Sequence, residues 1–221
     1  MALPKNQKLI NDIVNASWRL FLEKGYKDTT YSDIATACGV SKISVQNNFP
    51  LKSTLAAANL ERLRFCAAKV EHDEFPSVED AFSKMFLLGQ IYIAALLSSQ
   101  GSRAFLGDIL ESRLLTEETI SNDFRWSLKY AFGTVEAAQP SSQLRQDLIV
   151  AMGGLYELIY FNLASHKPFD IAQRMQPGMT VFGMQYGLGE KERNEVFKQF
   201  ALNDKKLQEL GGKALKLVSQ R

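Results

Sequence analysis

In the segment 25–50, the signals that start and stop helices come so close together that only short helices fit between them. Thr30 can accept hydrogen bonds from free N–H groups of a following helix, and Asp33, three residues later, can reach back as in a capping box. Gly39 then turns the chain and Ser41 offers a second cap. The expected helices are Tyr31–Cys38 and Lys42–Phe49, the second ended by Pro50.

A longer amphipathic helix precedes this pair. Its apolar residues recur at three- and four-residue steps, which is the spacing of one helix face. Gly25 is suited to end it, because glycine adopts left-handed backbone angles without steric cost. We expect this helix at Lys5–Lys24, with the stripe Leu9, Ile13, Ala16, Leu20 and Phe21 on its apolar face.

Helical spacing continues to the end of the chain, and strand-like alternation is scarce, so an all-α fold is predicted. Between residues 167 and 190, prolines and glycines favour a broken helix or a loop, and Gly211 and Gly212 are expected to weaken the last helix. Further helices are expected at 52–71, 78–99, 103–110, 117–138, 142–165 and 191–218.

This pattern of helices and breaks predicts that the chain has three parts. Residues 1–51 form an N-terminal three-helix domain, and residues 52–73 form a connecting long helix that ends shortly before Pro76. Residues 74–221 form a larger helical domain, which is long enough to bury a core of its own.

Composition excludes few classes of protein, because a net charge of +2 does not by itself indicate nucleic-acid binding. No signal-peptide core and no bilayer-spanning apolar run is present, so a cytoplasmic location is expected. Cys38 and Cys66 have no metal-binding spacing and are interpreted as buried, and His72 and His166 as surface residues. We expect no metal site and no cofactor.

Two short helices joined by a tight turn form a device for reading DNA, in which the second helix enters the major groove. Such a helix must be exposed and polar on its outer face. Val45 is expected to pack inward, whereas Ile43 could touch a thymine methyl group. The polar residues available for the outer face are Lys42, Ser44, Gln46, Asn47 and Asn48.

Residues Ile13 to Leu55 resemble the N-terminal domain of the tetracycline-repressor (TetR) family. The resemblance covers about a fifth of the chain and depends on an ordered series of residues. These are Ala16, Leu20, Phe21, Gly25-Tyr26, Thr29-Thr30, Asp33-Ile34-Ala35, Ala37-Cys38-Gly39-Val40-Ser41, Phe49, Lys52 and Leu55.

The resemblance implies that some side chains contact phosphates and others face base edges. Alternatively, Thr30 is only a helix cap, and the amides at 46–48 form a solvated polar face. Phosphate contacts are implied for Thr30, Gln46, Asn48 and Lys52. Base-edge contacts are implied for Lys42, Ser44 and Asn47.

Two positions depart from the family pattern. Gln46 stands where the family usually has a tyrosine that meets a phosphate, and its arm is shorter. Leu51 stands where a small polar cap is often found, so the helix that begins at Lys52 is expected to lack its cap. Both changes affect how the domain docks on the DNA backbone.

The resemblance also implies a small-molecule cavity between the middle helices of the C-terminal domain. Tyrosine and tryptophan provide apolar surface together with a polar group, which suits an amphipathic effector. Most large side chains there are interpreted as core, and a cavity filled by the protein's own side chains is the alternative. The expected lining residues are Met85, Tyr92, Trp126, Tyr130 and Tyr156.

Homodimerisation is expected because one short helix contacts few bases, whereas two copies can read half-sites about 34 Å apart, or multiples of that distance. The family implies an interface of two long helices per subunit, here Ser142–Ser165 and Lys191–Val218. In the alternative, these residues pack only within their own subunit. The stripe on the first helix consists of Gly153, Gly154, Leu155, Leu158 and Ile159.

Together these features predict a DNA-binding transcriptional regulator, a repressor that a small apolar or amphipathic effector releases from its operator. An enzyme is not expected, because no paired titratable groups can be placed in the C-terminal pocket. The alternative is a helical adaptor or ligand-binding protein of the same fold with weakened DNA binding, which the departures at Gln46 and Leu51 keep open.

Overall fold

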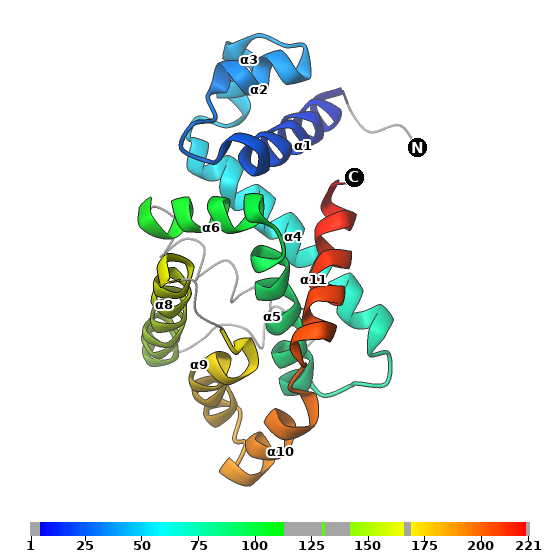
Figure 1. The fold of residues 1–221 in the computed structure, drawn as a ribbon, viewed down its shortest axis with the longest axis vertical. Helices are drawn as coiled ribbons and strands as arrows, with labels where there is room; N and C mark the ends of the chain where they lie inside the picture. The colour runs from blue at the N-terminus through cyan, green and yellow to red at the C-terminus, as the bar shows by residue number, and fades with distance from the viewer. Residues whose placement is uncertain (1–4, 113–129, 131–141, 166–168, 220–221) are drawn as a thin grey trace.

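The computed structural model describes residues 5–112, 130, 142–165 and 169–219, which form ten α-helices without a β-strand among them (Figure 1). The predicted all-α fold is confirmed. The first four helices are α1 (Lys5–Lys24), α2 (Tyr31–Cys38), α3 (Lys42–Asn48) and α4 (Lys52–Glu74). The others are α5 (Ala81–Leu97), α6 (Gln100–Ser112), α8 (Ser142–Ser165), α9 (Ile171–Gln185), α10 (Glu190–Phe200) and α11 (Asp204–Ser219). Apart from Tyr130, the expected helix at 117–138 lies outside the described residues.

Helices α1 to α3 form a head at one end of the molecule, and α4 leads from the head into the larger body formed by the later helices (Figure 1). The head has its own core of fully buried apolar side chains, as the amphipathic spacing of α1 predicts. This core contains Ile13, Phe21, Ile34, Val45 and Leu55.

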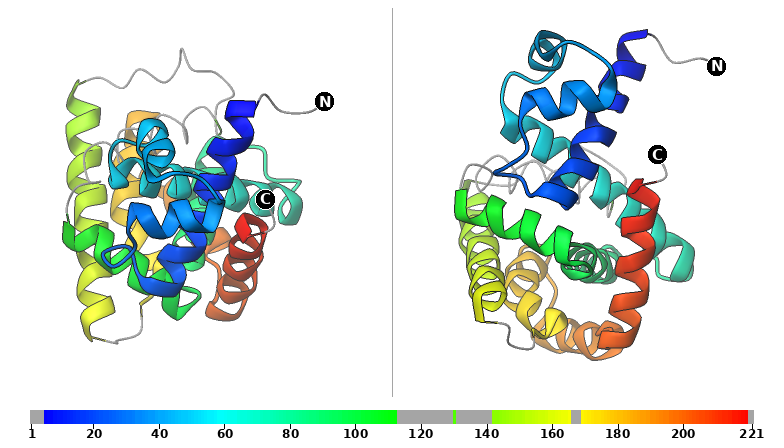
Figure 2. Two further views of the ribbon diagram at one scale, coloured as in Figure 1. Left: turned by 90° about the horizontal axis from the view of Figure 1, so that it is seen from above. Right: turned by 45° about the horizontal axis from the view of Figure 1, so that its top comes forward.

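Helix α6 lies directly beneath the head and joins it to the body (Figure 2). Its Phe105 is fully buried and stacks on Phe21 of α1 at a ring-centroid distance of 5.5 Å. A Cβ atom on Gly101 would lie 2.3 Å from the carbonyl oxygen of Leu22, so only glycine allows this close approach of α6 to α1. The head therefore shares part of its core with the body.

Helix α5 is almost entirely buried, and α11 packs along it and along α4. The expected weakening of α11 at Gly211 and Gly212 is wrong, because both glycines lie inside a continuous helix. A Cβ atom on Gly211 would lie 2.7 Å from the backbone of Ala94 and Ala95. Glycine is needed there for close helix packing, and the area this packing buries outweighs its poor helix propensity.

The expected single helix at 191–218 is two helices, and the chain breaks between Phe200 and Asp204. Fully buried Gln90 of α5 satisfies the backbone at this break. Its side-chain amide donates to the carbonyl of Phe200 at 3.0 Å, and its side-chain oxygen accepts from the N–H of Leu202 at 2.9 Å. A long-range contact of this kind leaves no signal in the local sequence.

The expected loop or broken helix at 167–190 is largely the helix α9, with Pro177 inside it. Asp170 caps its start by accepting the N–H of Gln173 at 2.9 Å. An apolar stripe at helical spacing is buried against the body, and this burial compensates for the hydrogen bond that the proline cannot donate. The stripe is Ile171, Met175, Met179 and Phe182.

Local caps also explain why α5 and α6 begin where they do. Asp80 accepts the N–H of Ser83 at 2.8 Å, so α5 begins at Ala81 rather than at the expected Val78. Ser99 accepts the N–H of Ser102 at 3.0 Å, so α6 begins three residues earlier than expected.

No single helix within the described ranges has the length and apolarity that spanning a bilayer requires. Helices α5 and α6 reach that length and apolarity only when taken together, and they are bent by 104° relative to each other.

Helix α4 begins without a side-chain cap, as its sequence predicts. Leu51 occupies the cap position with extended backbone angles, and its side chain is 63% exposed. The leucine therefore contributes neither a hydrogen bond to the first turn nor much buried area.

Replacing this leucine should stabilise the protein. Leu51→Ser supplies a hydroxyl acceptor for the first turn of α4, and we expect the free energy of unfolding to rise by about 1 kcal/mol. Chemical denaturation measures the change, and Leu51→Ala is the control that removes the same side chain without adding a cap. Equal stability of the serine and alanine variants would contradict this account of the helix start.

Candidate nucleic-acid interface

The start of α2 is fixed by a complete capping box, as predicted. The hydroxyl of Thr30 accepts the N–H of Asp33 at 3.2 Å, and the Asp33 carboxylate accepts the N–H of Thr30 at 2.8 Å. Lys24 at the end of α1 adds an ion pair to Asp33 at 2.9 Å. The backbone hydrogen bond from Thr30, with the contact from Lys24, lowers the pKa of Asp33 to about 2. Thr30 is an exposed helix cap, and its phosphate contact stays a prediction.

The turn between α2 and α3 closes over a single left-handed residue. Gly39 has φ 64°, an angle that side-chain-bearing residues rarely adopt, and Val40 bonds back to the carbonyl of Ala35 at 3.0 Å. Ser41 follows at once and accepts the N–H of Ser44 at 3.1 Å, which starts α3. The two short helices are thereby held in a fixed relation.

Helix α3 presents one buried side chain and a broad exposed surface. Val45 is fully buried against the head, as expected. The side chains of Ser44 and Asn48 are half-buried, and their polar groups already form hydrogen bonds within the protein. The Ser44 hydroxyl lies 2.9 Å from that of Ser41, and the Asn48 amide donates to the carbonyl of Ser44 at 2.8 Å. The exposed surface, which we call the reading surface, consists of Lys42, Ile43, Gln46 and Asn47.

Lys52, expected at a phosphate, serves inside the protein as a clamp between α4 and the turn after α1. Its ammonium group donates to the carbonyls of Tyr26 at 2.8 Å, Lys27 at 3.1 Å and Thr29 at 3.1 Å. It also lies 4.6 Å from the centre of the Tyr26 ring. An ammonium has three N–H donors, so all of them are in use. Burial lowers the pKa of Lys52, and a phosphate contact would require at least one of these bonds to break.

The body contains a second set of polar side chains, along the inner face of α4. Arg64 and Glu71 are two turns apart on that helix and are 4% and 1% exposed. The Arg64 guanidinium lies 5.6 Å from the ring centre of Tyr92. The Tyr130 hydroxyl donates to Glu71 Oε2, while Glu71 Oε1 has no hydrogen-bond partner among the residues that the structure describes. Burial raises the pKa of Glu71.

The expected effector-pocket residues lie partly around this set. Tyr92 is buried on α5 and Tyr156 is half-buried on α8. Desolvation raises the pKa of Tyr156. Met85 is half-buried against the core, and Trp126 lies outside the described residues. Arg64 and Glu71 were not among the residues predicted from the sequence to line the pocket. Their seven-residue spacing among apolar neighbours nevertheless places both on an inward face of α4.

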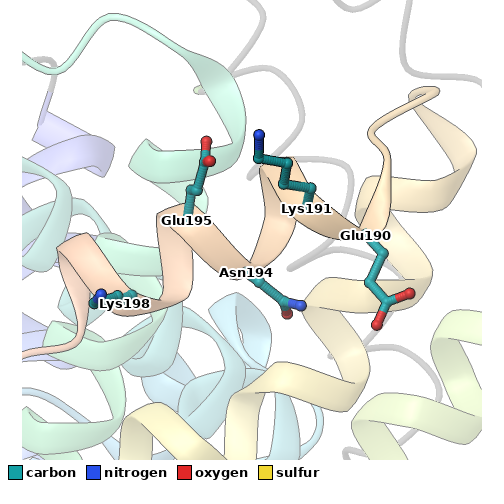
Figure 3. A pocket seen from close by; sticks show the side chains of 5 residues that line it. All are labelled: Glu190, Lys191, Asn194, Glu195 and Lys198. Atoms are coloured by element: carbon teal, nitrogen blue, oxygen red, sulfur yellow. The ribbon is translucent and has the colours of Figure 1, made fainter.

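Two surface hollows lie elsewhere. One follows the outer side of α10, where Glu190, Lys191 and Glu195 extend from a single helix without converging (Figure 3). The other, about 610 Å³, lies between α1, α2 and the end of α11 and includes Trp18 and Cys38. Among the described residues, no three His, Cys, Asp or Glu side chains form a metal-binding group.

The predictions that the two cysteines are buried and the two histidines exposed are confirmed in part. Cys66 is buried as expected, whereas Cys38 is only half-buried at the edge of the second hollow. His72 is exposed on α4, and His166 lies outside the described residues.

Residues 13–58 match the family model described as bacterial regulatory proteins, tetR family. The match spans most of α1, all of α2 and α3, and the start of α4, which is the part of the chain that builds the reading surface. No curated protein and no solved structure matches the chain.

The clamp by Lys52 can be separated from a role in DNA contact. In Lys52→Met, three carbonyls lose a charged donor, and we expect the free energy of unfolding to fall by about 1–2 kcal/mol. Chemical denaturation measures this loss. The matched control is Lys42→Met on the reading surface, where stability should change by less than about 0.5 kcal/mol. An unchanged stability of Lys52→Met would contradict the clamp.

Proposed function

We propose that this chain, whose tetR-family N-terminal domain makes it a DNA-binding transcriptional regulator, acts as a homodimeric repressor that a small amphipathic effector releases from its operator. The observation that carries the proposal is the reading surface of α3. It is exposed on a helix whose start, turn and inward anchor are all fixed by contacts within the head. A rigid, exposed and polar helix is what entry into a major groove requires.

The side chains of this surface suit distinct parts of a duplex. Asn47 can bind adenine through its amide, and Lys42 can bind guanine or neutralise a phosphate. Gln46 can donate to a phosphate, and Thr30 lies at the positive end of α2, where an anion is favoured. Ser44 and Asn48 contribute less in this proposal, because their polar groups already bond within α3.

The dimer surface that we propose lies on α8, at the outer edge of the body on the side away from α11 (Figures 1 and 2). Val150, Leu158 and Phe161 are 75%, 41% and 64% exposed and follow one face of this helix, together with exposed Gly154. Exposed apolar side chains along one face of a helix suit an interface between two copies of the chain.

Two parts of the expected interface are assigned differently. Leu155 and Ile159 are 5% and 1% exposed and pack inside their own subunit, whereas Gly153 is half-buried. In the second expected helix, at 191–218, the apolar face of the α11 part packs on α4 and α5 of its own subunit, so we propose no pairing through that face. Its buried residues are Leu207, Leu210, Ala214 and Val218.

Effector binding would reach the head through α4 and α6. Helix α4 carries Lys52 at the head and the Arg64–Glu71 set in the body. Helix α6 contacts the head through Phe105 and through Asp108, which accepts the N–H of Lys27 at 3.1 Å. A ligand that prefers a shifted α4 or α6 changes the separation of the two reading surfaces, by no more than its differential affinity allows.

The second candidate function is a helical adaptor of the same fold. The engagement of Lys52 with three carbonyls favours it, because the head then offers fewer free cations to phosphates than the family pattern implies. Binding to DNA separates the two candidates.

Selection from random double-stranded DNA should enrich one two-fold symmetric sequence with half-sites about one helical turn apart. Affinity for that sequence, measured by fluorescence anisotropy, should fall steeply with salt because bound phosphates release counterions. Lys42→Met should bind at least about tenfold more weakly because the loss occurs in both subunits. Absence of an enriched sequence, with a shallow salt dependence, would favour the adaptor.

Leu158→Glu should convert the dimer into monomers, because it places a charge in each half of an apolar interface. Analytical ultracentrifugation over a range of concentrations measures the change. The matched control is Phe65→Glu on α4, an exposed aromatic residue outside the α8 surface, which should leave the dimer intact. A wild-type monomer, or a Leu158→Glu dimer of unchanged affinity, would contradict the α8 assignment.

A further inference from the structure

Ile43 is an apolar side chain in the middle of an otherwise polar reading surface. It is 68% exposed, and its neighbours on that surface are Lys42, Gln46 and Asn47. A single exposed isoleucine on an ordinary surface needs no explanation. This one occupies the second position of the short helix that enters the groove, where each outward side chain meets either a base edge or a phosphate.

Ile43 and Asn47 form a pair on this surface. They are four residues apart on α3 and therefore neighbours on one face of the helix, with Cβ atoms about 5–6 Å apart. Successive base pairs in a duplex are about 3.4 Å apart. Side chains at this separation can reach neighbouring or next-neighbouring base pairs.

The chemistry of the pair matches an A·T-containing step. The thymine 5-methyl is the apolar group that bases present in the major groove, and an aliphatic side chain recognises it by contact. Adenine presents an acceptor and a donor side by side, which an asparagine amide can bind with two hydrogen bonds. A phosphate offers no favourable contact to an isoleucine, so the backbone does not explain the residue.

We infer that Ile43 is a specificity-determining residue that contacts a thymine 5-methyl group in each half-site, beside an adenine bound by Asn47. This inference rests on the proposed function and adds the base chemistry of the operator to it. Ile43 thus complements the hydrogen-bonding side chains, which cannot detect a methyl group.

The test uses the full-length protein and the sequence selected from random DNA. Each thymine is replaced in turn by deoxyuridine, which lacks only the 5-methyl group, and affinity is measured by fluorescence anisotropy. At one thymine per half-site, the replacement should weaken wild-type binding about fourfold, which is the effect of one buried methyl group. Ile43→Ala should bind more weakly than wild type and should respond equally to thymine and deoxyuridine at that position.

Leu51→Ala is the matched control. Among the described residues of the head, Leu51 is the other large aliphatic side chain that is strongly exposed, at 63%. It lies at the start of α4 rather than on α3, so its removal should preserve the response to deoxyuridine. Unfolding curves check that both variants remain folded. The inference is overturned if every deoxyuridine is tolerated, or if Ile43→Ala keeps the wild-type response. Failure to select any sequence would instead overturn the proposed function, and this inference with it.

Discussion

The hydrogen bonds from the Lys52 ammonium group to three carbonyls hold the reading surface in place. They join the first turn of α4 to the backbone between α1 and α2, at Tyr26, Lys27 and Thr29. Further along α4, the side-chain amide of Asn59 donates to the Ser17 hydroxyl of α1 at 2.9 Å, and Leu55 adds an apolar contact with the head core. Because the same turn leads into the capped start of α2, the position of α3 depends on this clamp.

The clamp also connects the head to the body, because α4 continues into the body. Arg62, on the same helix, donates to the Asn15 side chain of α1 and, at 2.7 Å, to the carbonyl of Val218 at the end of α11. Leu55 of the head core lies about two turns before Arg62 on α4, and the buried Glu71 lies about two and a half turns after it. Packed and hydrogen-bonded residues along α4 therefore connect Glu71 to the head.

Local signals in the sequence predicted the head almost completely. The bounds of α1 and α2, the capping box at Thr30, the cap at Ser41 and the missing cap at Leu51 all depend on residues close together in the chain. Predictions failed where distant contacts decide the structure. Burial outweighs Pro177 in α9, close packing against α5 keeps Gly211 in a helix, and distant carbonyls occupy the ammonium group of Lys52. The polar face of α3 was predicted, but the engagement of Ser44 and Asn48 depends on rotamers that the sequence does not specify.

Methylation interference on the selected operator tests most directly whether α3 reads the major groove. Methyl groups at guanine N7 lie in the major groove, whereas those at adenine N3 lie in the minor groove. We predict that guanine N7 methylation prevents binding in two clusters about one helical turn apart on the same face of the duplex, and that adenine N3 methylation between them has little effect. Interference confined to the minor groove, or a single unpaired cluster, would contradict a dimer that inserts two α3 helices.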